Sequence, residues 1–369
     1  MPQRQLSSSA RLRRAPPSAA SRPEMGLRAK EAQARRMTYT TAARNILLYH
    51  ELAGVLNALA DAGVPTILLK GAALASTVYP NIAHRPMGDL DLLVRPQDLE
   101  PARRILEAAG YRFVPEPEER FKPFDTQFTG ELGFRREIGR MGVLIELHWE
   151  IVIPEWYRRT TAFDVGALWE RAQPLELGGT RALQLSPEDT LIHLCVHLAA
   201  HAFHHPPAYD DIDRLVRVEA PFPWERFLER VAEFRVCTPA YFALSAARKL
   251  KGAPVPERVL TKLRPSSLRR KLVRAIADPE RVAVGEVPFS QPRSYLLHLA
   301  LADRPRDALA VLVWLLFPGP RWLAQRYMLQ GRLAPFLYAL FHPLFVMWQG
   351  FLGVRDLVKG RISPHRRPT

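Results

Sequence analysis

Apolar residues recur along the chain with both helical and strand-like spacing up to about residue 180. After that point the spacing is helical only. Between residues 37 and 62, leucine and valine return every three or four positions, as one face of a helix requires. "TILLK", "DLDLLV" and "YRFVP" are short apolar runs bounded by turn residues, which is typical of buried strands. Helices are expected for "GAALASTVY", which ends before Pro80, and from Pro96 to Ala109, with Gly110 at the cap.

A strand pair is expected between residues 125 and 151. "TQFTGELGFRRE" and "GVLIELHWEI" flank a turn near "IGRMG". Strand–helix–strand–helix followed by paired strands predicts a mixed α/β (α+β) layer. The first half of the chain is therefore expected to form one mixed sheet with helices.

Helical patterns replace the strand patterns in the second half. "LSPEDTLIHLCVHLAAHAFHH" starts with Ser186 as N-cap and Pro187 at the first helical position. Segments 223–236, 239–251 and 265–278 also have helical spacing, and no clear strand follows residue 185. We therefore expect three parts. They are a disordered basic extension (1–36), a domain with the mixed sheet (37–180) and an all-α C-terminal domain with apolar helices (181–369).

Two apolar runs lie near the C-terminus, at 308–319 and 335–354. The second is almost long enough to span a bilayer, but His342, Pro343 and Gln349 interrupt it. We expect a buried or interfacial helix pair rather than a spanning segment. Contact with a membrane surface through residues 308–354 stays open as an alternative.

The net charge of +15 suggests nucleic acid until its location is considered. Residues 1–36 have a net charge of +7 and residues 355–369 one of +4, so the middle is only mildly basic. This distribution argues against a dedicated DNA-binding protein and suits a phosphate-bearing substrate equally well. The two cysteines form no disulfide framework, and the N-terminus lacks the apolar core of a signal peptide. A cytoplasmic protein is expected, either free or peripheral at the inner membrane.

Carboxylates mark the candidate chemistry. Asp89 and Asp91 are two residues apart at the start of an apolar strand and should share a face. Glu146 interrupts another apolar run, with His148 and Glu150 on the same face. Converging carboxylates repel unless a cation lies between them, and hard oxygen ligands suit Mg²⁺. The alternative is that these acids cap strands or form the wet face of an edge strand.

A strand that runs through Gly71 into a helix comes before these acids. Such a turn presents backbone N–H groups at a positive helix end, where phosphate binds readily. Lys70 and Arg85 add positive charge nearby. The combination of this turn with a later Asp-x-Asp strand is more specific than either feature alone.

"LLKGAALASTVYPNIAHRPMGDLDLLV", followed by "GYRF" and "IELHWEI", resembles the nucleotidyltransferases of the DNA polymerase beta superfamily, in their small, uncharacterised bacterial branch. It is also similar, more distantly, to nucleotidyltransferase toxins of abortive-infection systems. The resemblance covers about residues 45–155. One departure is the pair Gly71-Ala72, where the superfamily usually has Gly-Ser or Gly-Gly.

The resemblance implies a function and roles for single residues. Asp89, Asp91 and Glu146 would be catalytic and would hold Mg²⁺ or Mn²⁺ in a two-metal site. Contacts to the nucleotide would come from Lys70, Gly71, Arg85 and Gly88. An NMP would pass from an NTP, ATP among them, to a hydroxyl of a small molecule, a peptide or protein, or an RNA end, and pyrophosphate would leave. The competing hypothesis is a catalytically idle protein that binds nucleotide or a partner at a membrane surface.

Histidines form a second polar group on the helix that starts at Pro187. His193, His197 and His201 are four residues apart, and Asp210, Asp211 and Asp213 follow. One interpretation is a metal site of the His/Asp type. The favoured one is a polar helix face that packs on the first domain, with Asp211 or Asp213 bonded to a histidine. A third is that His197 or His201 lines the acceptor pocket.

Overall fold

The computed structural model describes residues 22–114, 129–152, 155–286, 291–329, 331 and 333–359. Residues 1–40 and 41–369 form two units, each considered by itself. Helix α1 (Arg22–Asp61) begins in the first unit, so residues 22–36 are helical where the composition suggested a disordered extension. Alanine, arginine, glutamate and lysine in this stretch favour a helix, which explains the difference. Residues 1–21 lie outside the described residues.

The first half of the second unit forms one mixed sheet, as predicted, and the sheet has seven strands. The strands follow the order β3-β4-β5-β2-β1-β7-β6 across the sheet. They are β1 (Ile67–Leu68), β2 (Leu90–Leu93), β3 (Arg112–Val114), β4 (Glu131–Ile138), β5 (Met141–His148), β6 (Gln173–Leu177) and β7 (Thr180–Gln184).

Strand pairing determines which side chains meet at the centre of the sheet. β2 runs parallel to β5, with Asp91 opposite Glu146 and Leu93 opposite His148. β4 and β5 form the predicted antiparallel hairpin, in which Ile138 pairs with Met141. Gly139 in the two-residue turn has φ +61°, which glycine adopts without strain.

Helices account for most of the remaining chain. In the sheet domain they are α2 (Lys70–Thr77), α3 (Leu99–Ala108), α4 (Glu155–Arg158) and α5 (Val165–Glu170), with the 3-10 helices η1 (Ile82–His84) and η2 (Pro96–Asp98). The later helices are α6 (Pro187–Ala200), α7 (Pro206–Val218), α8 (Trp224–Glu233), α9 (Cys237–Lys251), α10 (Glu257–Leu263), α11 (Ser267–Ala277), α12 (Pro279–Ala283), α13 (Gln291–Leu301), α14 (Pro305–Leu316), α15 (Pro320–Arg326) and α16 (Ala334–Lys359).

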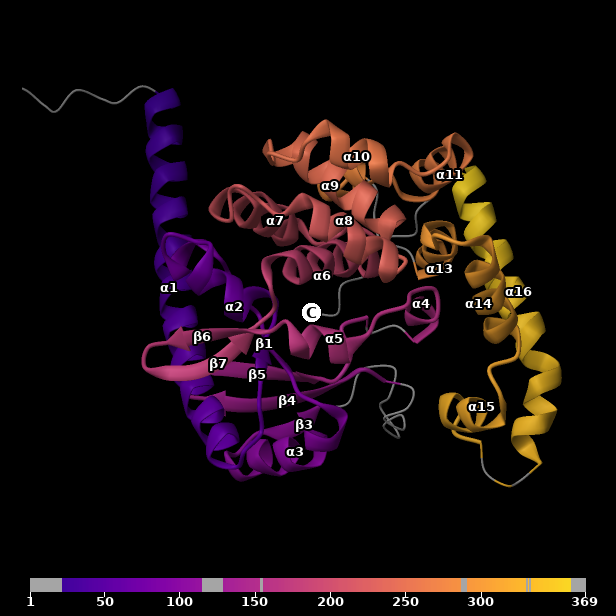
Figure 1. The fold of residues 1–369 in the computed structure, drawn as a ribbon, viewed down its shortest axis with the longest axis horizontal. Helices are drawn as coiled ribbons and strands as arrows, with labels where there is room; N and C mark the ends of the chain where they lie inside the picture. Colours follow the sequence, from indigo (N-terminus) through magenta and orange to yellow (C-terminus); the bar gives the residue numbers. More distant parts are fainter. Residues whose placement is uncertain are drawn as a thin grey trace, which may run out of the picture. The chain divides into compact units, whose positions relative to one another are not determined.

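The two faces of the sheet pack into two different apolar cores. Leu90 and Leu92 belong to the core that includes the C-terminal part of α1 and helix α3. Leu93, on the opposite face of β2, belongs to the core formed with the later helices. Figure 1 shows α6 over one face of the sheet and α3 under the other. Because Asp91 alternates with Leu92, its side chain lies on the face covered by the later helices.

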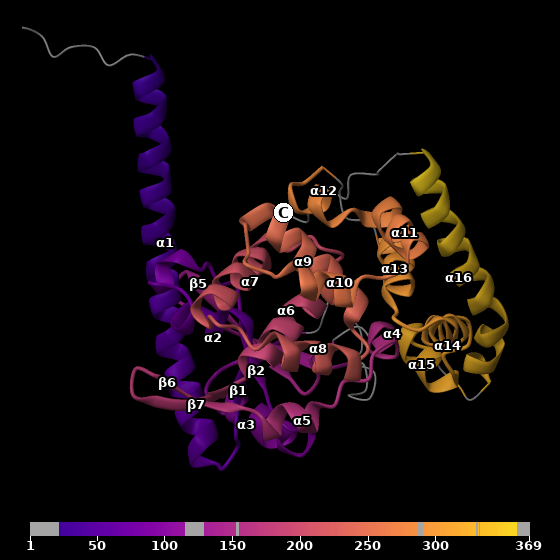
Figure 2. The ribbon, with the colours of Figure 1, turned by 45° about the horizontal axis from the view of Figure 1, so that its top comes forward.

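The all-α part begins slightly later than the predicted boundary at residue 180. Strands β6 and β7 form a hairpin that the sequence analysis did not identify, and β7 pairs in parallel with β1. Helix α6 then starts as predicted, because the Ser186 side chain accepts a hydrogen bond from the Asp189 N–H. Figure 2 shows α13, α14, α15 and α16 grouped together at the C-terminal end of the helical part.

Candidate active site

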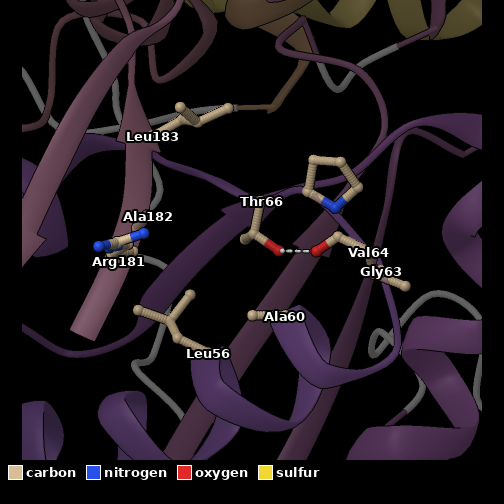
Figure 3. Close-up of a pocket in the computed structure, with 9 residues that line it drawn as sticks. Leu56, Ala60, Gly63, Val64, Thr66, Arg181, Ala182 and Leu183 are labelled. Atoms are coloured by element: carbon tan, nitrogen blue, oxygen red, sulfur yellow. Dashed lines mark hydrogen bonds between the residues drawn. The ribbon is translucent and has the colours of Figure 1, made fainter.

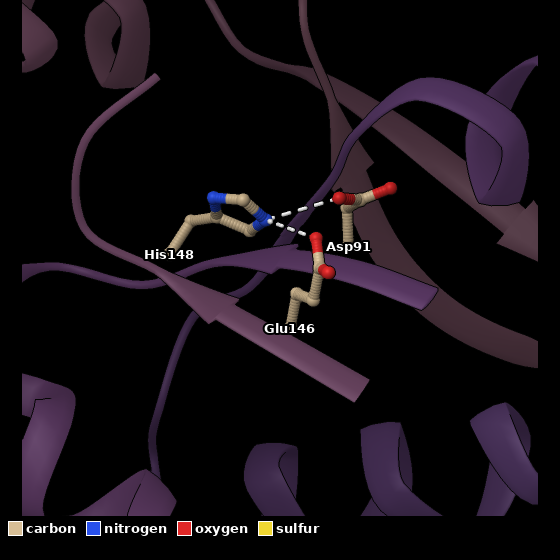
Figure 4. Close-up of side chains that lie close together, drawn as sticks. All are labelled: Asp91, Glu146 and His148. Atoms are coloured by element: carbon tan, nitrogen blue, oxygen red, sulfur yellow. Dashed lines mark hydrogen bonds and ion pairs between the residues drawn. The ribbon is translucent and has the colours of Figure 1, made fainter. Parts of the chain in front are cut away.

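Asp91, Glu146 and His148 form a compact cluster on strands β2 and β5. Each offers one ligand atom, and the three atoms all lie within 4.8 Å of one another. Nε2 of His148 lies 3.0 Å from Asp91 Oδ1 and 3.6 Å from Glu146 Oε2. Figure 4 shows this nitrogen directed between the two carboxylates. The Asp91 side chain is 2% exposed and that of Glu146 is 21% exposed, so solvent reaches the cluster on the Glu146 side.

Glu131 holds the other side of the His148 ring. It lies opposite His148 in the hairpin register, and its Oε2 is 3.1 Å from His148 Nδ1. A carboxylate behind a ligating imidazole orients the ring and strengthens it as a ligand. Glu131 was not among the site residues predicted from the sequence. In a hairpin with a two-residue turn at Gly139 and Arg140, Glu131 lies opposite His148. This register is the feature of the sequence that could have identified Glu131.

Lys70 supplies the positive charge closest to these carboxylates. Its Nζ donates to Asp91 Oδ1 at 2.6 Å and lies 4.0 Å from Glu146 Oε2. The backbone of Lys70 has φ +44°, which is unusual for a residue with a side chain and often marks functional sites. Lys70 is the first residue of helix α2, directly after the turn from strand β1, and its ammonium group reaches the carboxylates from there.

Burial and charge shift the pKa values in the cluster in opposite directions. Burial alone would raise the pKa of Asp91, but Lys70 and His148 hold it well below its usual value. Burial raises the pKa of Glu146. Burial alone would lower the pKa of His148, but Glu131, Asp91 and Glu146 together raise it to about 9. At neutral pH the imidazole is therefore protonated and neutralises part of the carboxylate charge.

Asp89 lies outside the compact cluster because strand β2 begins only at Leu90. It is half-buried, and both burial and the charge of Asp91 raise its pKa. The structure therefore brings together two of the three predicted acids, with His148 as the third group. Asp89 remains close enough to influence them electrostatically.

The two predicted glycines have different surroundings. A Cβ atom on Gly71 would lie 3.0 Å from Met87 Cγ, so a larger residue here would have to push the Met87 side chain aside by a few tenths of an ångström. A Cβ on Gly88 would meet nothing within 4 Å. The backbone at Gly88 is instead held by Arg44, whose guanidinium donates to the carbonyls of Met87 and Gly88.

Arg85 makes a different contact from the phosphate contact that the sequence suggested. Its guanidinium forms a bidentate pair with Asp211 of α7, at 2.7 and 2.8 Å, and it is buried. Tyr79 donates a further hydrogen bond to Asp211 at 2.7 Å. Asp211 therefore bonds Arg85 and Tyr79 rather than a histidine. This cluster joins the sheet domain to the helical part.

A row of histidines follows the face of α6 and continues beyond its end. Ring centroids are 6.1 Å apart between His193 and His197 and 4.4 Å apart between His197 and His201, and His205 lies 4.9 Å from His197. His193 is buried, and neither ring nitrogen has a hydrogen-bond partner among the described residues. Burial and the charge of Lys70 lower the pKa of His193 to about 3. The row is therefore neutral and electrostatically coupled to the carboxylate cluster.

A pocket of about 310 Å³ lies away from this chemistry, between the end of α1 and strand β7. Figure 3 shows its mostly apolar lining, in which Thr66 donates to the Val64 carbonyl. Arg181 is the one charged residue in the lining. No described carboxylate or imidazole faces this pocket, so we place the candidate active site at Asp91, Glu146 and His148.

The donor set of the cluster fits a divalent cation. Two carboxylates and an imidazole converge, and in the structure the protonated Lys70 and His148 balance their charge. Carboxylate oxygens suit Mg²⁺ and Mn²⁺, and an imidazole is a better ligand for Mn²⁺ than for Mg²⁺. A bound cation would take over the charge balance that these two side chains provide.

Comparison with known proteins gives one result. A family model described as an uncharacterised nucleotidyltransferase matches residues 21–252. This range includes the whole sheet, the carboxylate cluster and helices α6 to α9. A search of curated proteins and a search of solved structures each find no match to the chain.

Proposed function

Because the chain belongs to the family of uncharacterised nucleotidyltransferases, we propose that it transfers an NMP from an NTP to an acceptor hydroxyl and releases pyrophosphate. The observation that carries this proposal is the position of Asp91 directly opposite Glu146 on adjacent parallel strands, with Lys70 beside both. Nucleotidyl transfer depends mainly on positioning and on charge neutralisation, and this cluster provides groups for both.

Asp91, Glu146 and His148 would hold a divalent cation, Mg²⁺ or Mn²⁺, and Asp89 is the nearby acid available for a second one. Such an ion, when bound, neutralises phosphate charge and lowers the pKa of a hydroxyl. Glu131 would orient His148 as a ligand through its 3.1 Å contact with Nδ1.

The side chains have separate tasks in the proposed reaction. Lys70 has a flexible stem and would pair with phosphate oxygens near the start of α2, where the helix dipole also favours negative charge. Glu146 is the more exposed carboxylate, and its raised pKa suits a proton acceptor. The acceptor oxygen forms a bond to the α-phosphorus. The bond between the α-phosphorus and the oxygen that bridges it to the β-phosphorus breaks at the same time. The hydroxyl proton goes to Glu146, and pyrophosphate leaves with the bonding electrons.

We propose that the acceptor is a small molecule, a peptide or protein side chain, or an RNA end, and that the enzyme works in the cytoplasm. Neutral imidazoles that include His193 and His197 lie on the helical side of the cluster. A neutral imidazole both donates and accepts a hydrogen bond, so it suits an uncharged hydroxyl-bearing acceptor.

The test is incubation of the full chain with each α-labelled NTP, Mg²⁺ or Mn²⁺, and fractionated cell extract. We expect label to appear on one acceptor fraction. Asp91→Asn and Glu146→Gln should each lower the rate by at least about 100-fold, because loss of even an indirect metal contact costs 10- to 100-fold.

Glu150→Gln is the matched control, because Glu150 follows β5 but lies 3.6 Å from Arg158 and outside the cluster. This variant should keep the wild-type rate. Transfer that persists in both Asp91→Asn and Glu146→Gln would contradict the proposal. Nucleotide binding without transfer to any fraction, unchanged by these substitutions, would favour the idle binding protein instead.

A further inference from the structure

Helix α16 presents an apolar surface that no other described part of the chain covers. Its exposed side chains are large and apolar on most of the helix circumference. They are Phe336, Leu337, Tyr338, Leu340, Phe341, Leu344, Phe345, Met347, Trp348, Phe351 and Val354. In helix α14, Leu309, Leu312 and Val313 are exposed as well. Contiguous apolar surface of this extent marks an interaction site.

The covered side of α16 has the opposite character. Most of its less exposed positions are small or polar, with Val346 and Leu352 as the large aliphatic exceptions. They are Ala334, Pro335, Ala339, His342, Pro343, Val346, Gln349, Gly350, Leu352 and Gly353. A helix on the surface of a water-soluble protein places its apolar side chains inward and its polar ones outward. Helix α16 reverses this order, and the reversal is expected where the surrounding medium is hydrocarbon.

The one histidine inside the apolar stretch has both ring nitrogens paired with the protein. His342 is buried, with Nδ1 2.8 Å from the Tyr327 hydroxyl and Nε2 2.9 Å from the Leu315 carbonyl oxygen. Leu315 lies in the last turn of α14, where carbonyl groups lack partners within the helix. Polar residues at membrane depth face the protein interior and pair with such groups.

Length and charge point to the same partner. The apolar segment Ala334–Arg355 has 22 residues, or about 33 Å of helix, which is close to the thickness of a hydrocarbon core. Residues 308–354 contain no acidic residue, and residues 355–369 contain five Lys/Arg and one acid. A basic flank next to an apolar helix is attracted to anionic lipid headgroups.

We propose that α14, α15 and α16 attach this protein to a lipid bilayer, with the exposed apolar face of α16 against the acyl chains. The attachment holds the candidate active site at a membrane surface. The inference is independent of the transfer reaction, because it depends on residues 305–369 alone.

Flotation of the full chain with vesicles tests the attachment. Vesicles of phosphatidylcholine with phosphatidylglycerol should carry the wild type upward in a density gradient. The variant Leu340→Asp/Leu344→Asp should bind at least about 10-fold less, because an aspartate in hydrocarbon is costly. The matched control is Leu268→Asp/Val284→Asp, which changes two exposed apolar residues outside α14–α16 and should float like the wild type.

Trp348, 56% exposed on α16, reports insertion directly. Acyl chains that carry bromine should quench the tryptophan emission of the wild type. Trp348→Phe should lower that quenching and leave the part that comes from Trp314 of α14 and Trp322 of α15. Circular dichroism and thermal unfolding of each variant establish that it folds. Wild type that stays at the bottom of the gradient, or Leu340→Asp/Leu344→Asp that floats equally well, overturns the proposal. A lipid-free dimer that buries α16 and does not float overturns it too, in favour of a protein interface.

Discussion

At the scale of single residues, His148 is the group that would link cation binding at the carboxylate cluster to pH. Its ring lies between Asp91 and Glu146 on one side and Glu131 on the other. These acids raise its pKa to about 9, so the side chain is an imidazolium at neutral pH. An imidazole binds a metal only when it is neutral, so metal binding at the proposed site would be coupled to proton release.

We predict that binding of Mn²⁺ at pH 7.5 releases about one proton from His148. The apparent affinity should therefore rise with pH until it levels off near pH 9. Isothermal titration in two buffers of different ionisation enthalpy measures the number of protons released. His148→Asn is the comparison, in which this release should disappear. Binding to the wild type with no proton released would show that His148 does not ligate the ion.

At the scale of structural elements, the loop between η1 and β2 is held from two directions. Arg44 of α1 donates to the backbone carbonyls of Met87 and Gly88 in this loop. Asn45 of α1 donates to the carbonyl of Arg85 in the loop and to that of Ile82 in η1. Asp211 of α7, in the helical part, forms a buried ion pair with the Arg85 side chain. This loop leads directly into the strand with Asp91, so both contacts help to position the carboxylate.

We predict that breaking the Arg85–Asp211 pair destabilises the fold strongly. Arg85→Met or Asp211→Asn alone should lower the free energy of unfolding by about 3–5 kcal/mol, because a buried charge loses its partner. The double variant Arg85→Met/Asp211→Asn should recover part of this loss. Urea unfolding of the wild type, both single variants and the double variant gives the coupling energy.

Lys251→Met of α9 provides the matched control, because its partner Asp210 precedes Asp211 on α7. It removes the exposed pair between Lys251 and Asp210, whose nitrogen and oxygen lie 2.8 Å apart. This change should cost less than about 1 kcal/mol, as exposed ion pairs usually do. Equal effects in the buried and exposed pairs would refute the role assigned to Asp211.

At the scale of the whole molecule, the helical part buries neutral histidines above the sheet. Burial lowers the pKa of His193 to about 3 and that of His298 to about 4. In the unfolded chain both would titrate near the ordinary value of about 6.5. Between these values the unfolded state binds protons that the folded state does not, so stability falls as the pH falls below 6.5.

We predict a loss of about 2 kcal/mol for each of these histidines between pH 7.5 and pH 5. The variant His193→Leu should lose less stability over this range, by about that amount, because it has one fewer group to protonate on unfolding. Urea unfolding at the two pH values measures the difference. An unchanged pH dependence in His193→Leu would contradict the prediction.

Much of the fold was predictable because it depends on local patterns. Alternating apolar positions predicted the β4–β5 hairpin, and Ser186 and Pro187 predicted the start of α6. The hairpin β6–β7 was missed because its strands carry a weak pattern, with few buried positions and two glycines in the turn. Its place beside β1 depends on pairing across more than a hundred residues.

The sequence by itself determined that Asp91 and Glu146 are acids within apolar strands and that Lys70 precedes a strand-to-helix turn. The tertiary structure decided which groups meet. Parallel pairing of β2 with β5 placed Asp91 opposite Glu146, the hairpin register added Glu131, and packing of α7 engaged Arg85 with Asp211. It also turned the apolar side of α16 outward. Spacing along a chain determines which residues share a face, whereas partners from distant segments depend on how the faces pack.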